Sequence, residues 1–247
     1  MPTSDDYYWQ MLTRQLPLIS KEDQMKFKDS KIAVIGCGGI GGSVIEMLAR
    51  MGVGELILVD KDTFDVTNLN RQVMSTSENL NQPKAEVSKE RVHKINQNIK
   101  VKAYNLELNE NNTAELLKES DIIVDALDNI ITRVVLSRYC IETGKPFISG
   151  AIHGTMGQLT VFKNKTDYET LFNLPSANKK LTEETKSMLK KLEKNTPPAI
   201  GPTPNIIGAL EAIEAFKIIT GVGKVIEAPE IINFDLLDLN SFNIEKF

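Results

Sequence analysis

The chain has 247 residues, of which 41% are hydrophobic and 25% are charged. Its 33 acidic and 29 basic side chains give a formal net charge of −4. These proportions are those of an ordinary globular protein. They exclude a mainly disordered chain and do not indicate a broad basic surface for nucleic acid or anionic lipid.

The cysteine content and the first residues bear on the compartment. Cys37 and Cys140 are the only cysteines, which is too few for a disulfide framework or a four-cysteine zinc site and is typical of a reducing compartment. Residues 1–9 lack the basic-then-apolar pattern of a signal peptide, and no apolar run approaches the roughly 18 residues that span a bilayer. We therefore expect a cytoplasmic protein with no membrane segment and no nucleic-acid partner.

In chain order, the first expected feature is an N-terminal helical arm, formed by two short helices within residues 7–28. Beyond it, short apolar strands alternate with amphipathic helices, which is typical of βαβ units in a parallel sheet. The expected strands are 31–36, 55–60, 101–106, 121–126 and 145–150, and the expected helices are 41–51, 84–96, 113–119 and 130–143. The sequence thus predicts the α/β class, with a doubly wound, Rossmann-like sheet.

The pattern changes after residue 162. Residues 163–203 show little strand signal and are rich in lysine and proline, which predicts a crossover loop with one lysine-rich helix. In that helix three apolar residues are expected to share one face: Leu181, Met188 and Leu192.

The C-terminal part returns to regular structure. Residues 205–220 are expected to form an amphipathic helix that ends at Gly221, and residues 231–236 a last strand. Within the helix, four apolar side chains are expected to face the core and three charged ones to face solvent: Ile206, Leu210, Ile213 and Phe216 inward, and Glu211, Glu214 and Lys217 outward.

A glycine-rich turn leaves the first strand and opens a helix, with Gly36, Gly38, Gly39 and Gly41. Glycines let the backbone turn sharply and approach a phosphate chain, and a helix N-terminus presents unpaired N–H groups. Asp60 ends the next strand, where its carboxylate can accept ribose hydroxyls. This layout favours nucleotide binding over a glycine turn that only packs a helix on a strand, but it does not distinguish one nucleotide cofactor from another.

The residues after Asp60 favour ATP over a nicotinamide cofactor. Arg71 and Lys84 supply two cations that can hold an extended triphosphate and stabilise charge on a leaving pyrophosphate. Asp128 follows the strand 121–126, at the edge where open α/β sheets bind ligands, and its carboxylate is a candidate ligand for Mg²⁺. Taken singly, these residues also fit surface or helix-capping roles. Further candidate contacts are Asp62, Thr67, Asn68, Gln72 and Asn129.

Several segments together resemble the ubiquitin-activating-like adenylyltransferases, in particular the molybdopterin-synthase and thiazole-pathway sulfur-carrier-protein adenylyltransferases. The resemblance covers nearly the whole chain and fits a single adenylation domain. The matching segments are LTRQLPL (12–18), GCGGIGGS (36–43), GVGELILVDKD (52–62), VTNLNRQV (66–73), QPKAEV (82–87), DALDN (125–129) with the following TR (132–133), GKPFISGAIHGTMGQLTVF (144–162) and IIGALEAIEAFKIITG (206–221). The domain, residues 1–247, divides into the N-terminal helical arm (1–29), a nucleotide-binding core (30–162), the crossover loop (163–203) and a C-terminal helix and strand (204–247).

The resemblance implies a reaction. The C-terminal glycine carboxylate of a small ubiquitin-like sulfur-carrier protein ending in Gly-Gly attacks the α-phosphate of ATP, giving an acyl adenylate and pyrophosphate. Because that carboxylate is ionised at neutral pH, the enzyme supplies positioning and positive charge. The implied contacts are Gly39, Asn68, Arg71 and Lys84 to the phosphates, Asp60 to the ribose and Asp128 to magnesium. Arg14 is implied to reach the nucleotide of the partner subunit, so a homodimer is expected.

Two departures from the family bear on chemistry. Many members hold a structural zinc with two CxxC pairs, whereas Asp167 and Thr170 stand at the first pair here, so we expect no zinc. Members that form a thioester or acyl disulfide carry a cysteine in the crossover loop, and residues 163–203 contain none. Cys140 is expected to be buried. The expected activity therefore ends at the adenylate.

Three alternatives remain open. A related enzyme of the same fold would adenylate a peptide or act on a tRNA-linked carboxylate, and the negative net charge disfavours the tRNA substrate. A catalytically silent binding module would use the fold to hold a partner. A nicotinamide dehydrogenase fits only the glycine turn.

Overall fold

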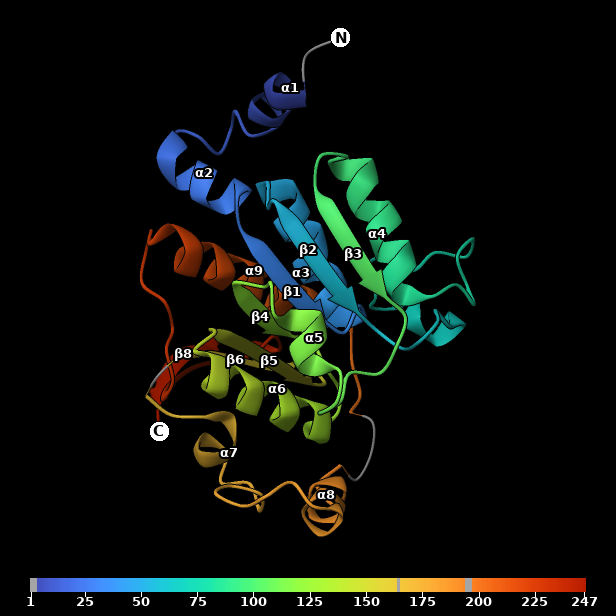
Figure 1. Cartoon of the computed structure of the whole chain (residues 1–247), viewed down its shortest axis with the longest axis vertical. Helices are drawn as coiled ribbons and strands as arrows, with labels where there is room; N and C mark the ends of the chain where they lie inside the picture. Colours follow the sequence, from blue (N-terminus) through green and yellow to red (C-terminus); the bar gives the residue numbers. More distant parts are fainter. Residues whose placement is uncertain (1–3, 164, 194–196) are drawn as a thin grey trace.

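The computed structural model describes residues 4–163, 165–193 and 197–247, so parts of the predicted crossover loop lie outside the described residues. Across this part of the chain, eight strands form one sheet in the order β3-β2-β1-β4-β5-β6-β7-β8 (Figure 1). The strands are β1 (Lys31–Ile35), β2 (Glu55–Val59), β3 (Lys100–Tyr104), β4 (Ile122–Asp125), β5 (Phe147–His153), β6 (Met156–Phe162), β7 (Glu230–Asp235) and β8 (Asp238–Lys246).

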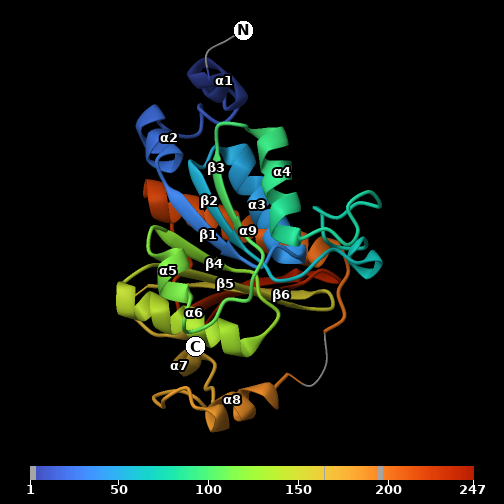
Figure 2. The ribbon, with the colours of Figure 1, turned by 45° about the vertical axis from the view of Figure 1, so that its right-hand side comes forward.

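The helices lie on both faces of this sheet, as in a doubly wound fold (Figures 1 and 2). They are α1 (Ser4–Met11), α2 (Lys21–Lys28), α3 (Gly39–Met51), the 3₁₀ turn η1 (Val66–Asn68), α4 (Lys84–Ile95), α5 (Thr113–Leu117), α6 (Ile130–Thr143), α7 (Tyr168–Leu171), α8 (Glu183–Lys190) and α9 (Pro202–Thr220). The predicted fold class is confirmed, and the first five strands and the helices between them lie within a few residues of their predicted bounds.

The side chains of each strand point alternately to the two faces of the sheet, so the core is divided into two clusters, one on each face. Ile32 and Val34 of β1 join the cluster beneath α2, α3, α4 and α9, while Ala33 and Ile35 join the one beneath α5 and α6. Successive strand side chains point to opposite faces, and a strand covered on both faces is apolar at every position. The continuous apolar run of β1 is therefore the sequence signal of a central strand.

The register brings the ends of the central strands to one level. Ile35, the last residue of β1, pairs with Val59 at the end of β2 and with Asp125 at the end of β4. The loops that follow these three strands consequently start side by side, at the edge where open α/β sheets bind ligands.

The sheet is parallel from β3 to β5 and antiparallel from β5 to β8. β8 is not predicted by the sequence, because the mixed run DLNSFNIEK has a weak apolar pattern. β8 lies at the edge of the sheet, where one of its residues, Phe242, stacks on Phe234 of β7 at a centroid distance of 4.6 Å.

The burial predicted for α9 is confirmed for Phe216, which is 5% exposed, and is wrong for Glu211, Glu214 and Ile213. Glu211 and Glu214 are 0% and 1% exposed, whereas Ile213 is 37% exposed. The helix packs against both the sheet and α3, so it is buried on more than one face. Of the two carboxylates, Glu214 has polar partners. Glu214 binds Lys217 at 2.5 Å and accepts from the Ile226 N–H at 3.1 Å.

The crossover loop contains the expected lysine-rich helix, α8, but its predicted apolar face is wrong. Leu181 and Leu192 lie outside the helix, and the fully buried side chain is Leu189. Thr182 caps α8, accepting from the Thr185 N–H, and so sets its start after Leu181. Figure 2 shows α7 and α8 beyond α6, away from the sheet.

No helix in the described ranges is both long and apolar enough to cross a membrane.

Candidate active site

A cleft of about 260 Å³ opens where the loops after β1, β2 and β4 meet. Its walls also include residues from the crossover loop, Pro197 and Ala199, and from the start of α9, Pro204. Most of the residues predicted for nucleotide binding line it, namely Gly36, Gly38, Gly39, Asp60, Asp62, Arg71, Gln72, Lys84, Asp128 and Asn129. Four predicted residues do not line it: Arg14, Gly41, Thr67 and Asn68.

The glycine turn leads into α3 at one end of the cleft. Gly36 has φ +95°, and a Cβ there would lie 2.5 Å from the Ala126 carbonyl oxygen, so only glycine fits without strain. Gly38 is the N-cap of α3, and no side chain caps the helix. The first N–H groups of this 13-residue helix are therefore available to an anion in the cleft.

Gly41 serves packing. A Cβ on Gly41 would lie 1.8 Å from the Gly36 carbonyl oxygen, which shows how closely α3 approaches the turn that precedes it. Gly41 therefore does not line the cleft, but it allows α3 to pack closely against the turn that does.

Asp60 is held by the backbone at the end of β2. Its Oδ2 accepts from the Cys37 N–H at 2.7 Å and its Oδ1 from the Asp62 N–H at 2.8 Å. Burial raises the pKa of Asp60, and the two N–H groups and Lys84 oppose the shift. Each oxygen keeps acceptor capacity, as contact with two ribose hydroxyls requires.

Lys84 is a buried cation of the cleft. It is the first residue of α4, is 8% exposed, and its Nζ lies 3.6 Å from Asp62 Oδ2. The Lys84 N–H also donates to the Asp62 carbonyl at 2.9 Å, so the loop after β2 holds the start of α4.

Arg71 is the second cation, and the residues before it hold its side chain. Its Nη1 donates to the Thr67 carbonyl at 2.8 Å and to Asn70 Oδ1 at 2.9 Å. Asn68 accepts from the Asp65 N–H at 3.1 Å and closes a capping box over η1. In this structure Thr67 and Asn68 thus shape the segment that presents Arg71.

Asp128 and Asn129 follow β4 and differ in their contacts. Asn129 caps α6, its Oδ1 accepting from the Thr132 N–H at 2.9 Å. Asp128 is exposed in the cleft, and its side chain has no hydrogen bond to any residue that the structure describes. A free carboxylate beside a phosphate site fits Mg²⁺, which takes one or two carboxylates with phosphate oxygens.

The cleft includes residues without a predicted role. Lys61 and Glu107 line it and form an ion pair at 2.8 Å. Arg133 lines it from α6 and is 8% exposed. One feature of the sequence could have indicated that Arg133 lines the cleft. This residue lies four residues after Asn129, in the first turns of a helix that starts at the cleft.

Arg14 lies elsewhere in the chain. It is exposed in the turns between α1 and α2, which Figure 1 shows near the start of β1. The cleft lies at the other end of that strand, after Ile35. The arm is held by Tyr8, which donates to the Gly52 carbonyl at 2.8 Å.

Both thiols are inside the protein and free. Burial is the first cause that raises the pKa of Cys37 and of Cys140, so neither is a ready nucleophile. The described residues contain no group of three or more His, Cys, Asp and Glu side chains able to hold a metal ion.

The chain is similar to known proteins over most of its length. Residues 12–247 match the ThiF family. The sulfur carrier protein adenylyltransferase of Thermus thermophilus is 33% identical over 241 residues, which are 95% of this chain and 84% of that protein. The molybdopterin-synthase adenylyltransferase of Haemophilus influenzae is 34% identical over 85% of this chain and 82% of its own length.

Solved structures share the fold. The crystal structure of E. coli MccB with ATP has a TM-score of 0.75 and 25% identity over 91% of this chain. MccB in complex with N-formylated MccA has a TM-score of 0.77, also at 25% identity. This chain covers 65% and 66% of those two chains.

Both the predicted resemblance and the α/β fold are thereby confirmed. The chain belongs to the ThiF family, and its relatives named above from Thermus and Haemophilus are adenylyltransferases.

Proposed function

We propose that this protein is an ATP-dependent adenylyltransferase acting on the C-terminal glycine of a small ubiquitin-like sulfur-carrier protein. The observation that carries the proposal is the convergence, in one cleft, of an uncapped helix N-terminus, two cations and a free carboxylate: α3, Arg71, Lys84 and Asp128. The names of the Thermus and Haemophilus relatives support the substrate class.

The cleft suits adenylation because it offers positive charge rather than a nucleophile. The substrate carboxylate oxygen forms a bond to the α-phosphorus, the bond from that phosphorus to the bridging oxygen breaks, and pyrophosphate leaves with the electron pair. The α3 N–H groups, Arg71 and Lys84 stabilise charge on the phosphates, and Asp60 orients the ribose. Asp128 would hold Mg²⁺, which supplies further charge neutralisation when bound.

The test is ATP–pyrophosphate exchange, measured with each small protein of the same genome that ends in Gly-Gly. Exchange that depends on one carrier and is lost in Asp128→Ala supports the proposal and identifies the substrate. Binding of ATP without exchange, for every carrier, would count against it.

A peptide substrate is the second candidate. It is favoured by the likeness to MccB, whose structure in complex with N-formylated MccA is known. Exchange stimulated by short peptides with a free C-terminal carboxylate, and by no Gly-Gly carrier, would select this alternative. If the protein binds ATP but shows no pyrophosphate exchange with either peptides or carriers, a binding module is favoured. Binding of tRNA at moderate salt would favour the tRNA-directed enzyme.

We also propose a homodimer in the cytoplasm. A shallow surface depression between α3, α4 and α9 contains Met47, Val73 and Ala209, and Val73 is 49% exposed. Polar and charged side chains surround these apolar ones, namely Ser43, Glu46, Arg91 and Asn205. An exposed apolar centre within a polar rim fits a subunit contact. The two free thiols fit a reducing compartment.

Arg14 is proposed to complete the site of the partner subunit, because in its own chain it lies away from the cleft. Mixing Arg14→Ala with Asp128→Ala subunits tests this directly. If Arg14 acts across the dimer, a mixed dimer has one intact site, and an equal mixture recovers about a quarter of the wild-type exchange. If Arg14 acts within its own chain, the mixture stays inactive.

A further inference from the structure

A cluster of buried charged side chains lies beneath the cleft. Its members are Asp125 at the end of β4, Arg133 on α6 and Glu211 on α9. Asp125 and Glu211 are fully buried, and Arg133 is nearly so. Because burying ionisable groups is costly, the contacts of this cluster indicate what it holds in place.

Arg133 connects two segments that border the cleft. Its Nη2 donates to the Leu127 carbonyl at 2.6 Å and to the Gly150 carbonyl at 3.2 Å. Leu127 directly precedes Asp128, and Gly150 of β5 directly precedes Ala151, which lines the cleft. One guanidinium therefore joins the loop after β4 to the neighbouring strand.

Asp125 holds the same loop from its other side. Its Oδ1 accepts from the Leu127 N–H at 3.1 Å, and its Oδ2 lies 2.6 Å from Arg133 Nε. Ser149 donates to Oδ2 at 2.7 Å. The N–H and the carbonyl of Leu127 are thus both bound by one buried ion pair, just before the residue whose carboxylate enters the cleft.

We propose that Arg133 is a positioning residue for Asp128, acting through the Leu127 backbone and the Gly150 carbonyl. The proposal rests on the adenylation proposed above and deepens it. Since the Asp128 side chain has no hydrogen bond within the described residues, its place depends on its backbone, and Arg133 fixes that backbone.

Glu211 completes the charge balance. It packs against Gly150, where an added Cβ would meet its Oε1 at 2.7 Å. Burial, and then Asp125, raise the pKa of Glu211, while Arg133 and the Gly150 N–H oppose the shift. Because a raised pKa favours the neutral acid, Glu211 competes less with Asp125 for Arg133, and the guanidinium can donate to the two carbonyls.

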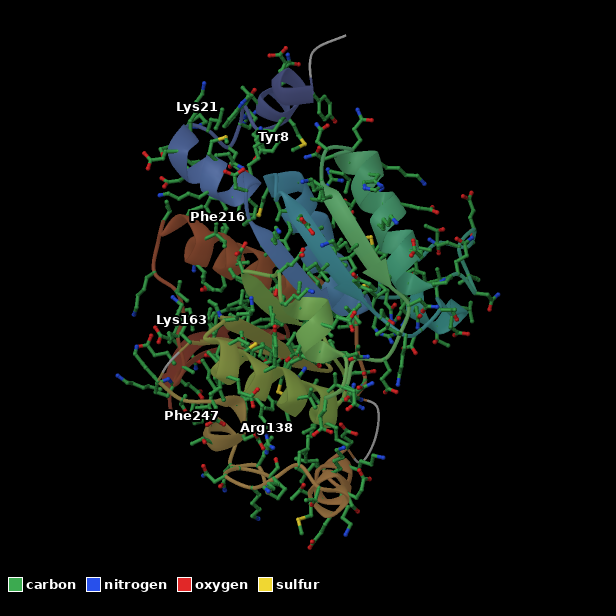
Figure 3. The ribbon with its side chains drawn as sticks, viewed as in Figure 1. Tyr8, Lys21, Arg138, Lys163, Phe216 and Phe247 are labelled. Atoms are coloured by element: carbon green, nitrogen blue, oxygen red, sulfur yellow. The ribbon has the colours of Figure 1, made fainter. Side chains whose placement is uncertain are left out.

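Arg133→Lys tests the proposal, because lysine keeps the charge but lacks the planar fork that reaches several acceptors. Arg138→Lys is the matched control. Arg138 lies on the same helix, forms a two-pronged ion pair with Glu169 at 2.7 and 2.8 Å, and does not line the cleft. Figure 3 shows Arg138 on the side of α6 that faces the crossover loop.

The expected result for Arg133→Lys is a kcat for carrier-dependent exchange about 10- to 100-fold below wild type, with the KM for ATP unchanged. Amide hydrogen exchange at residues 127–130, measured without nucleotide, should accelerate. Arg138→Lys should keep the wild-type kcat and the wild-type exchange at 127–130.

Equal kcat for both variants and the wild type, with equal protection of residues 127–130, would overturn the role given to Arg133. A wild-type protein that fails to exchange with any carrier would instead overturn the proposed function. In that case the amide measurement still decides whether Arg133 holds the loop.

Discussion

Lys84 and Lys89 both lie on α4 but have different surroundings. Lys84 is buried at the cleft and 3.6 Å from Asp62, whereas Lys89 pairs with Glu86 at 3.7 Å on the surface. Lys84→Gln is expected to lower the pyrophosphate-exchange rate about 10²- to 10³-fold, because a fixed positive charge is lost at the phosphates. Lys89→Gln should match the wild type, and a similar loss in both would remove Lys84 from the site.

Two adjacent glycines of α3 allow a test of the turn. An alanine Cβ at Gly41 would lie 1.8 Å from a backbone carbonyl oxygen, whereas at Gly42 its nearest contact is the flexible Met74 side chain at 3.3 Å. Gly41→Ala is expected to destabilise the fold by about 3 kcal/mol or more, and Gly42→Ala to change it by less than about 1 kcal/mol. Urea unfolding measures both, and equal stabilities would show that the turn relaxes freely.

A residue's place in the sequence can predict that it lines the cleft. Asp60 ends one predicted strand, Asp128 follows another, Lys84 starts a predicted helix, and all three line the cleft. Arg133 was missed because its role depends on carbonyls at positions 127 and 150, and every residue type offers the same carbonyl. Backbone acceptors leave no trace in the sequence.

Among the elements, α9 gives the largest difference between prediction and structure. The prediction from helical periodicity places apolar residues on one face, and it assumes that only this face is buried. Here α3, β5 and β6 all contact α9, so carboxylates on other faces are buried as well. What decides their placement is the set of partners that fold around them, which local sequence does not specify.

Glu211 makes stability depend on pH in a defined direction. Because burial raises the pKa of Glu211 well above the usual value of a glutamate, the folded state retains a proton that the unfolded state releases. The free energy of unfolding should therefore fall as pH rises from about 4.5 through the folded pKa. Glu211→Gln should flatten this decline, as measured by urea unfolding at a series of pH values.

Glu86→Gln is the matched control for that series, since Glu86 is a surface residue of α4 whose side chain is 48% exposed. It should leave the slope of stability against pH unchanged. A steep decline that persists in Glu211→Gln would assign the proton to another group.

For the whole molecule, the depression containing Val73 carries the proposed subunit contact. Val73→Asp is expected to give monomers, because it places a charged side chain beside the apolar residues Met47 and Ala209 at the proposed contact. Light scattering after size-exclusion chromatography measures the mass. Leu237→Asp is the control, since Leu237 is 84% exposed in the turn between β7 and β8. A wild-type protein that is already monomeric would refute the contact and the role of Arg14 across it.

The way Pro204 meets Gly39 has a consequence for synthesis of the chain. A Cβ on Gly39 would lie 3.1 Å from Pro204, so the start of α9 packs on the phosphate end of the cleft although the two residues belong to opposite parts of the sequence. When only the first five strands have emerged from the ribosome, the glycine turn is already made but Pro204, which packs on it, is not. This wall of the cleft is complete only after residue 204 emerges, so nucleotide binding should mark a late stage of folding on the ribosome.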